Sequence, residues 1–155
     1  MAAAPIIAIF EAPLGSDLYA QAVRLREAIL RTPLGLTVSL EELTDDAMRQ
    51  HFCAVSHGAV VGTVSLRPID EATLQLKQMA VAETRRRMQI GTRLLDYAET
   101  WAARGGFRLI VLHARIGAER FYLKLGYSEE GARFDENTIP HVKMTKRLGL
   151  QRSDI

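Results

Sequence analysis

The sequence predicts a single α/β domain, over residues 1–155, in which a mixed central sheet of about seven strands is flanked by about four helices. A chain of 155 residues has the usual length of one domain. Hydrophobic residues make up 48% and charged residues 25% of it, a composition that can bury a core without a disulfide or metal. Strand and helix periodicities also alternate along the chain, in the order β-α-α-β-β-β-α-β-α-β-β.

One strand and two helices are expected first. Ile6–Phe10 is a short apolar run typical of a strand. Asp17 is a candidate N-cap for a helix that runs to about Arg31, because apolar residues recur at helical spacing between them. Ser39 stands three residues before a glutamate, the capping-box pattern, which predicts a second short helix that ends near Gln50.

The residues from Phe52 onward follow the periodicity of strands. Phe52–Val55 and Ala59–Leu66 are rich in β-forming residues and are joined through His57-Gly58, which predicts a hairpin. After a turn, Thr73–Val81 is a third run, with alternate residues on one face.

The second half of the chain begins with an amphipathic helix from about Arg86, which Gly105-Gly106 ends. Phe107–His113 is strongly apolar, as expected for a strand at the centre of a sheet. The remaining expected elements are a short helix over 118–125 and two strands at 133–134 and 141–144. One strand-helix-strand unit therefore lies in the middle of the chain.

Charge and cysteine content limit the partners and the compartment. The 20 Lys and Arg residues exceed the 18 Asp and Glu by two, which is too little to require a nucleic-acid partner. Cys53 cannot form an intrachain disulfide, which fits a reducing compartment. The N-terminus lacks the basic lead of a signal peptide, and no apolar run approaches the roughly eighteen residues of a membrane span. We expect a cytoplasmic protein with no membrane partner.

Arg85-Arg86-Arg87 lies between a predicted strand and a predicted helix. Three cations at a helix N-terminus oppose the helix dipole, so an anion is expected there. Free N–H groups make a helix N-terminus a phosphate site, and arginine side chains suit a pyrophosphate. The alternative is a solvated, arginine-rich turn. The segment lacks the glycines and the Lys-Ser/Thr pair of known phosphate loops and dinucleotide fingerprints.

The segment Arg86-Arg87-Met88-Gln89-Ile90-Gly91 resembles the acyl-CoA site of the GNAT superfamily of N-acetyltransferases, whose pattern is Gln/Arg-x-x-Gly-x-Gly/Ala. Gln89 departs from the pattern, because it stands where the first glycine is expected. At a position that needs a positive φ, a glutamine would be strained. We expect Gln89 to be helical already, where a glutamine is harmless.

Three further segments resemble the same family. Gln78–Val81 is similar to the strand that pairs with the pantetheine arm, and Ala118–Tyr127 is similar to the Ala-x-x-Phe-Tyr-x-Lys-x-Gly-Phe/Tyr segment. His113-Ala114-Arg115 together with Ile139–Met144 is typical of the subgroup often called YjcF-like or ElaA-like. The resemblance covers nearly all of residues 17–148 in element order and implies a GNAT-like fold.

The resemblance implies an N-acetyltransferase that moves an acetyl group from acetyl-CoA to a primary amine of a small molecule or peptide. It assigns Met79, Ala80 and Val81 to the pantetheine arm and the thioester. It assigns a run of seven residues to the pyrophosphate: Arg86, Arg87, Met88, Gln89, Ile90, Gly91 and Thr92. Phe121 and Lys124 also fall in the cofactor-binding part of the pattern. Family members often pair as dimers, which makes a homodimer one of the assemblies open to the chain, but the sequence does not fix the oligomeric state.

Tyr122 matches the tyrosine that serves the leaving group in the family. A phenol has a pKa of about 10 and a thiol of about 8.5, so full proton transfer to the thiolate is uphill by about 2 kcal/mol. Tyr122 is therefore expected to donate a hydrogen bond to the developing thiolate. The alternative is a core aromatic residue beside Phe121.

The general base is left open by the sequence. No glutamate occupies Thr73–Val81, where many relatives have one. His113 and His141 are the candidates, because imidazole titrates near neutral pH. Each histidine could instead be structural, His141 could shape the acceptor pocket, and a chain of waters could accept the proton. The four histidines are too scattered for a metal site, so no metal is expected.

Two other classes of function remain as alternatives. A non-catalytic acyl-CoA-binding or sensor domain would explain the departure at Gln89, but it has no need of Tyr122. A nucleic-acid module could use the arginine-rich turn, but the sequence offers no aromatic stacking platform and no named nucleic-acid motif.

Overall fold

The computed structural model describes residues 6–83 and 89–149. The strands are β1 (Ala8–Glu11), β2 (Gln50–Ser56), β3 (Ala59–Pro68), β4 (Thr73–Val81), β5 (Leu109–Arg115), β6 (Ser128–Glu136) and β7 (Ile139–Arg147). The helices are α1 (Asp17–Arg26), α2 (Leu40–Asp46), α3 (Ile90–Arg104) and α4 (Glu119–Lys124), with a π-helical turn over Glu27–Arg31 and a 3₁₀ turn over Thr32–Leu34. The predicted order of elements is confirmed.

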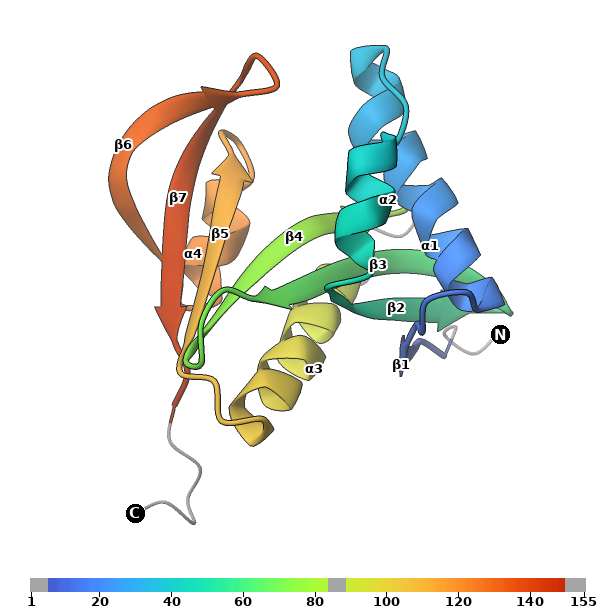
Figure 1. Cartoon of the computed structure of the whole chain (residues 1–155), viewed down its shortest axis with the longest axis horizontal. Helices are drawn as coiled ribbons and strands as arrows, with labels where there is room; N and C mark the ends of the chain where they lie inside the picture. The colour runs from blue at the N-terminus through green and yellow to red at the C-terminus, as the bar shows by residue number, and fades with distance from the viewer. Residues whose placement is uncertain (1–5, 84–88, 150–155) are drawn as a thin grey trace, which may run out of the picture. The chain divides into compact units, whose positions relative to one another are not determined.

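The strands are hydrogen-bonded in the order β1-β2-β3-β4-β5-β7-β6 (Figure 1). Strands β4 and β5 pair in parallel, while β1-β2, β2-β3, β5-β7 and β6-β7 are antiparallel. The sheet is therefore mixed, as predicted, and β4-α3-β5 is the predicted strand-helix-strand unit. The chain divides into two compact units, one of Met1–Arg67 with Gln78–Ala98 and one of Pro68–Lys77 with Glu99–Ile155.

The hairpin of β2 and β3 organises the first unit. His57 and Gly58 form its turn, with φ of 51° and 75°. Two consecutive residues with positive φ give a turn whose twist matches that of the strands, and this explains why the His-Gly pair predicts the hairpin correctly. Phe52 pairs with Val64 in the resulting register.

Helices cover both faces of this hairpin. The His51 ring meets Tyr19 of α1, with 5.1 Å between ring centroids, and the Phe52 ring meets Tyr97 of α3, with 5.7 Å between centroids. Successive residues of a strand point to opposite faces, so α1 and the first half of α3 lie on opposite sides of β2. Figure 1 shows α1 and α2 on one side of β2 and β3, and α3 on the other.

The first helix differs from its prediction at both ends. The Ser16 side chain accepts a hydrogen bond of 3.1 Å from the Tyr19 amide, so Ser16 is the N-cap and Asp17 is the first helical residue. The α-helix ends at Arg26, five residues early, and continues as the π-helical turn. The second cap is as predicted, because Ser39 accepts a hydrogen bond of 3.1 Å from the Glu42 amide.

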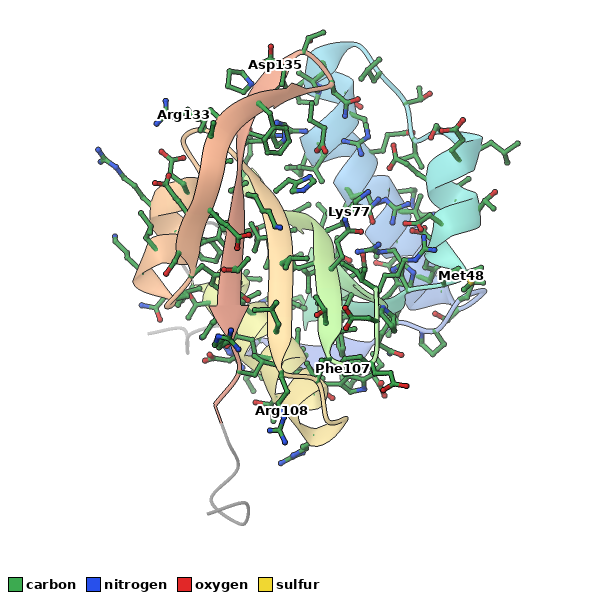
Figure 2. All side chains as sticks on the ribbon, turned by 60° about the vertical axis from the view of Figure 1, so that its left-hand side comes forward. Met48, Lys77, Phe107, Arg108, Arg133 and Asp135 are labelled. Carbon is green, nitrogen blue, oxygen red and sulfur yellow. The ribbon has the colours of Figure 1, made fainter. Side chains whose placement is uncertain are left out.

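In the second unit, β5 is paired on one side with the start of β4 and on the other with β7. The β6-β7 hairpin turns through Asn137 and Thr138, with φ of 52° and 63°. Figure 2 shows Asp135 near the tip of this hairpin and Arg133 lower on β6. Both strands are longer than the predicted 133–134 and 141–144. Most residues of β6 are exposed, so its sequence has no apolar alternation from which its full length could be predicted.

None of the helices within residues 6–83 and 89–149 has the length and the apolar character needed to cross a bilayer.

Candidate functional site

The last residues of β4 leave regular strand geometry. Gln78 has a φ of 62°, in the left-handed region. Ala80 is buried, and Met79 and Val81 are half-buried. One residue beyond the strand, the Ala82 amide donates to the Val61 carbonyl at 2.9 Å, which holds the end of β4 against β3.

The start of α3 follows in the same unit. Ile90 is fully buried against the sheet, and the first turn contains no acidic side chain. The Arg93 amide donates to the Gln89 carbonyl at 3.0 Å, which joins the first turn of the helix to Gln89. The first turn of a helix generally leaves N–H groups without an acceptor inside the helix, so the start of α3 is a place where an anion can bind.

The backbone of Gln89 corrects the expectation that this position is helical. Gln89 has a φ of 56°, in the left-handed region, and it is exposed. A side chain with a Cβ costs about 1–2 kcal/mol in this conformation, whereas glycine adopts it freely. The glycine of the family pattern therefore suits the left-handed backbone at this position. Gln89 adopts the same backbone conformation, but with strain. Arg86, Arg87 and Met88, which the sequence assigns to the pyrophosphate, lie outside the described residues.

Tyr122 lies in α4 and is buried, with 7% of its surface exposed. Its ring makes edge contacts with Phe121 and Tyr127, at centroid distances of 5.0 and 5.6 Å. Burial raises the pKa of the phenol well above its ordinary value of 10.0, so Tyr122 stays protonated at neutral pH and can donate a hydrogen bond. Phe121 is half-buried and Lys124 is exposed.

The structure brings the two predicted histidines together around one carboxylate. His113 of β5 and Glu136 of β6 are joined at 3.0 Å between Nδ1 and Oε1. His141 of β7 approaches the other oxygen, with 3.6 Å between Nε2 and Oε2. The Phe134 ring contacts both imidazoles, edge-on to His113 and stacked with His141.

The two imidazoles share one tautomer but face this carboxylate with different nitrogen atoms. A carboxylate only accepts, so neutral His113 carries its proton on Nδ1 and has Nε2 free as a proton acceptor. The carbonyl of Ile139 is 2.7 Å from His141 Nδ1, so His141 also carries its proton there, and its acceptor nitrogen faces Glu136. His113 is the exposed histidine of the two and His141 is buried. The geometry therefore favours His113 as an acid–base group.

The contact of Glu136 with the two histidines is not evident from the sequence. The β6-β7 register pairs Glu136 with Ile139 and Phe134 with His141, and it is this register that brings the carboxylate to the imidazoles. A prediction of the hairpin turn at 137–138 would have supplied the register. Arg26 of α1 is buried and binds Asp46. Among the described residues, no group of three or more His, Cys, Asp or Glu is arranged to hold a metal ion.

Residues 18–127 match the family model described as the acetyltransferase (GNAT) family. A protein of Bacillus subtilis (strain 168), whose name places it among acetyltransferases, is 30% identical over 129 residues, which is 81% of this chain and 87% of that protein. The crystal structure of an N-acetyltransferase from Lactobacillus plantarum is similar with a TM-score of 0.81 and 25% identity, over 92% of this chain and 98% of that one.

Two more distant structures share the fold. One is an acetyltransferase of the same family from Elizabethkingia anophelis with acetyl-CoA bound, with a TM-score of 0.71 and 22% identity over 92% of this chain and 98% of that one. The other is an aminoglycoside 6'-N-acetyltransferase in complex with coenzyme A, with a TM-score of 0.77 and 22% identity over 93% of this chain and 98% of that one.

Proposed function

The chain belongs to the GNAT family of acetyltransferases, and on that premise we propose that it transfers the acetyl group of acetyl-CoA directly to a primary amine of a small molecule or peptide. In this proposal residues 1–155 act as one acyl-CoA N-acyltransferase domain. The observation that carries the proposal is the start of α3. A helix end is positive and offers N–H donors, and the first turn of α3 has no acidic residue, which together suit a pyrophosphate.

Acetyl-CoA is the co-substrate of the family, and two of the similar structures hold CoA or acetyl-CoA. We assign the backbone of Met79, Ala80 and Val81 to the pantetheine arm and the thioester. An N–H group of this strand that points at the thioester oxygen would stabilise the negative charge that develops there. The residues from Arg86 to Thr92 bind the pyrophosphate in this assignment, and Phe121 and Lys124 complete the cofactor side.

The transfer forms a bond between the amine nitrogen and the acetyl carbon and breaks the carbon–sulfur bond. Tyr122 donates a hydrogen bond to the leaving thiolate, because its raised pKa keeps the phenol protonated but opposes complete proton transfer. The Nε2 atom of His113 accepts the proton of the amine, directly or through a water. Glu136 orients this imidazole and stabilises it once it is charged. His141 is then a wall of the acceptor site.

Three finer assignments remain predictions. Membership of the YjcF-like or ElaA-like subgroup depends on the motifs around His113 and His141 alone. A homodimer and a cytoplasmic location follow only from the resemblance and the composition. The alternative of a non-catalytic acyl-CoA sensor receives no support from the comparisons, whose named relatives include acetyltransferases.

Release of free CoA in the presence of amines tests the proposal. The protein is incubated with acetyl-CoA and a panel that contains a simple alkylamine, a polyamine, an aminoglycoside and a peptide with a free N-terminus. We expect at least one amine to accelerate thiol release above the rate without amine, with the acetylated product detected by mass spectrometry. Binding of acetyl-CoA without release for any amine would favour the sensor instead.

A further inference from the structure

Gln78 occupies a backbone conformation that its residue type disfavours. It lies inside β4, yet its φ is 62°. Left-handed residues other than glycine, asparagine and aspartate persist where their surroundings hold them. The contacts of the Gln78 side chain are therefore the place to look for what holds this part of the strand.

Three groups from three different elements bind the Gln78 amide. Its Oε1 atom accepts hydrogen bonds from Arg26 Nη1 at 3.1 Å and from Ser65 Oγ at 3.3 Å. Its Nε2 atom donates to Glu42 Oε2 at 3.4 Å. A side chain bound by α1, β3 and α2 at once has little freedom to rotate, and neither does the backbone that carries it.

Arg26 is itself fixed. Its guanidinium makes two hydrogen bonds to Asp46, of 3.1 Å between Nη1 and Oδ1 and 2.7 Å between Nη2 and Oδ2. Both side chains are excluded from solvent, with 3% of Arg26 and 1% of Asp46 exposed. Tyr19 adds a hydrogen bond of 2.5 Å to the same carboxylate. The planar fork of the arginine binds both carboxylate oxygens of Asp46 through two nitrogens and also reaches Gln78, whereas a lysine offers its donors from a single nitrogen.

The Arg26 guanidinium binds Gln78 in addition to neutralising the charge of Asp46. The Arg26 Nε atom is buried and has no hydrogen-bond partner among the described residues, and Glu42 Oε2 lies 3.9 Å from it. The guanidinium thus keeps its bond to Gln78 while one of its own N–H groups stays unpaired, which is unfavourable for a buried donor.

We propose that Arg26 and Gln78 are positioning residues, which hold the left-handed turn of β4 and so aim the N–H groups of Met79, Ala80 and Val81. The inference rests on the proposed function, in which these N–H groups bind the pantetheine arm and the thioester. A peptide plane turned at Gln78 redirects the groups that follow it, and a small misdirection is sufficient to weaken catalysis. Neither residue needs to touch the substrate.

The test compares Gln78→Gly with Gln78→Val. Glycine adopts a positive φ freely, so the strand can keep its turn without the side chain, whereas a β-branched valine draws it to extended geometry. We expect Gln78→Val to weaken acetyl-CoA binding and lower kcat by about tenfold or more, and Gln78→Gly to lose about threefold. Gln75→Val, in the same strand but without a positive φ, is the control and should not change either quantity.

Arg26→Lys provides a second test, which distinguishes a positioning role of Arg26 from a role in stability alone. It keeps a cation beside Asp46 but removes the fork. If Arg26 acts through Gln78, Arg26→Lys lowers acetyl-CoA affinity in the wild-type background and has little further effect in the Gln78→Gly background. Equal effects in both backgrounds, or losses that follow the Tm alone, would show a merely structural role.

Crystal structures of the two Gln78 variants without ligand give a readout that does not depend on activity. We expect the left-handed turn to persist in Gln78→Gly and to be lost in Gln78→Val. A Gln78→Val protein that keeps the turn, or that loses it and still binds acetyl-CoA like the wild type, overturns the inference alone. A wild-type protein that binds no acetyl-CoA overturns the proposed function and the inference with it.

Discussion

Gly62 of β3 lies directly against Ile90, the first residue of α3. A Cβ atom at Gly62 would come within 2.7 Å of Ile90 Cγ2 and within 2.9 Å of Leu94 Cδ1. Both distances are shorter than van der Waals contact, so a residue without a side chain lets α3 lie this close to the strand. The contact fixes where α3 begins, and its beginning is the proposed pyrophosphate site.

Gly62→Ala is predicted to destabilise the protein and to weaken acetyl-CoA binding together. The added methyl overpacks the contact with Ile90 and Leu94, at a cost of about 1–3 kcal/mol. Denaturant unfolding measures the first effect and calorimetric titration the second. Gly149→Ala is the control, because a Cβ there meets nothing within 4 Å. An alanine at 62 without loss of stability would contradict the packing described here.

Gln89→Gly is predicted to raise the free energy of unfolding by up to about 1.6 kcal/mol. Relief of the left-handed conformation gains about 1–2 kcal/mol, and the greater freedom of glycine in the unfolded chain offsets about 0.4–1 kcal/mol of it. Gln75→Gly, where φ is not positive, should lose stability instead. Thermal unfolding of the two variants measures the change in stability. Equal losses of stability would contradict the strain inferred at Gln89.

Tyr122→Phe is predicted to lower kcat by about 10- to 100-fold, because the leaving thiolate loses its hydrogen bond. The acetyl-CoA dissociation constant should stay nearly the same, since the ring still fills its place between Phe121 and Tyr127. Tyr97→Phe, in an exposed position on α3, serves as the control. A parallel loss of affinity, turnover and Tm would mean that Tyr122 only supports the core.

His113→Gln is predicted to lower turnover by about 100-fold near neutral pH, with a smaller loss at higher pH, where more of the amine is already deprotonated. Glu136→Gln should lose less, because it removes the orienting carboxylate and leaves the base. Glu129→Gln, on the same strand, is the matched control. If His141→Gln proves the more damaging change across the pH profile, the roles of the two histidines are exchanged.

Acid is predicted to destabilise the protein through His51. Burial lowers the pKa of His51 below its ordinary value of 6.5, and the buried neutral ring lies 3.0 Å from the Asp46 carbonyl, with Nε2 toward it. The unfolded chain therefore binds the proton at higher pH than the folded one, so the contribution is complete above about pH 7 and declines as the pH falls below about 6.5.

His51→Gln keeps a donor for the Asp46 carbonyl but does not titrate, so Tm should depend less on pH between about pH 7 and pH 5. His57→Gln, in the exposed turn of the β2-β3 hairpin, should keep the dependence of the wild type. An unchanged pH profile for His51→Gln would assign the acid sensitivity to other groups.

Most of the fold is predictable because local sequence signals mark where helices begin and where strands turn. Ser39 caps α2, and His57-Gly58 turns the first hairpin, each by local chemistry that a sequence carries. The length of β6 is not predictable in this way. Its residues are nearly all exposed, so pairing with β7 defines it rather than any pattern of its own.

The candidate site is likewise predictable in part. The family pattern identifies the segments, but it does not reveal that Gln78 and Gln89 are both left-handed, because a glutamine gives no sign of a positive φ. Glu136 was missed as the partner of His113 for a related reason. Its position depends on hairpin register, which is a property of paired strands and not of either strand alone.

Thermal unfolding with and without acetyl-CoA tests the central claim most directly. A ligand at about 100 times its dissociation constant stabilises the folded state by about 2.7 kcal/mol. In a chain of 155 residues this is a rise of several degrees in Tm. We predict that rise with acetyl-CoA and none with ATP at the same concentration. No rise with acetyl-CoA would contradict a cofactor site at the start of α3, and the enzyme and the sensor would both be excluded.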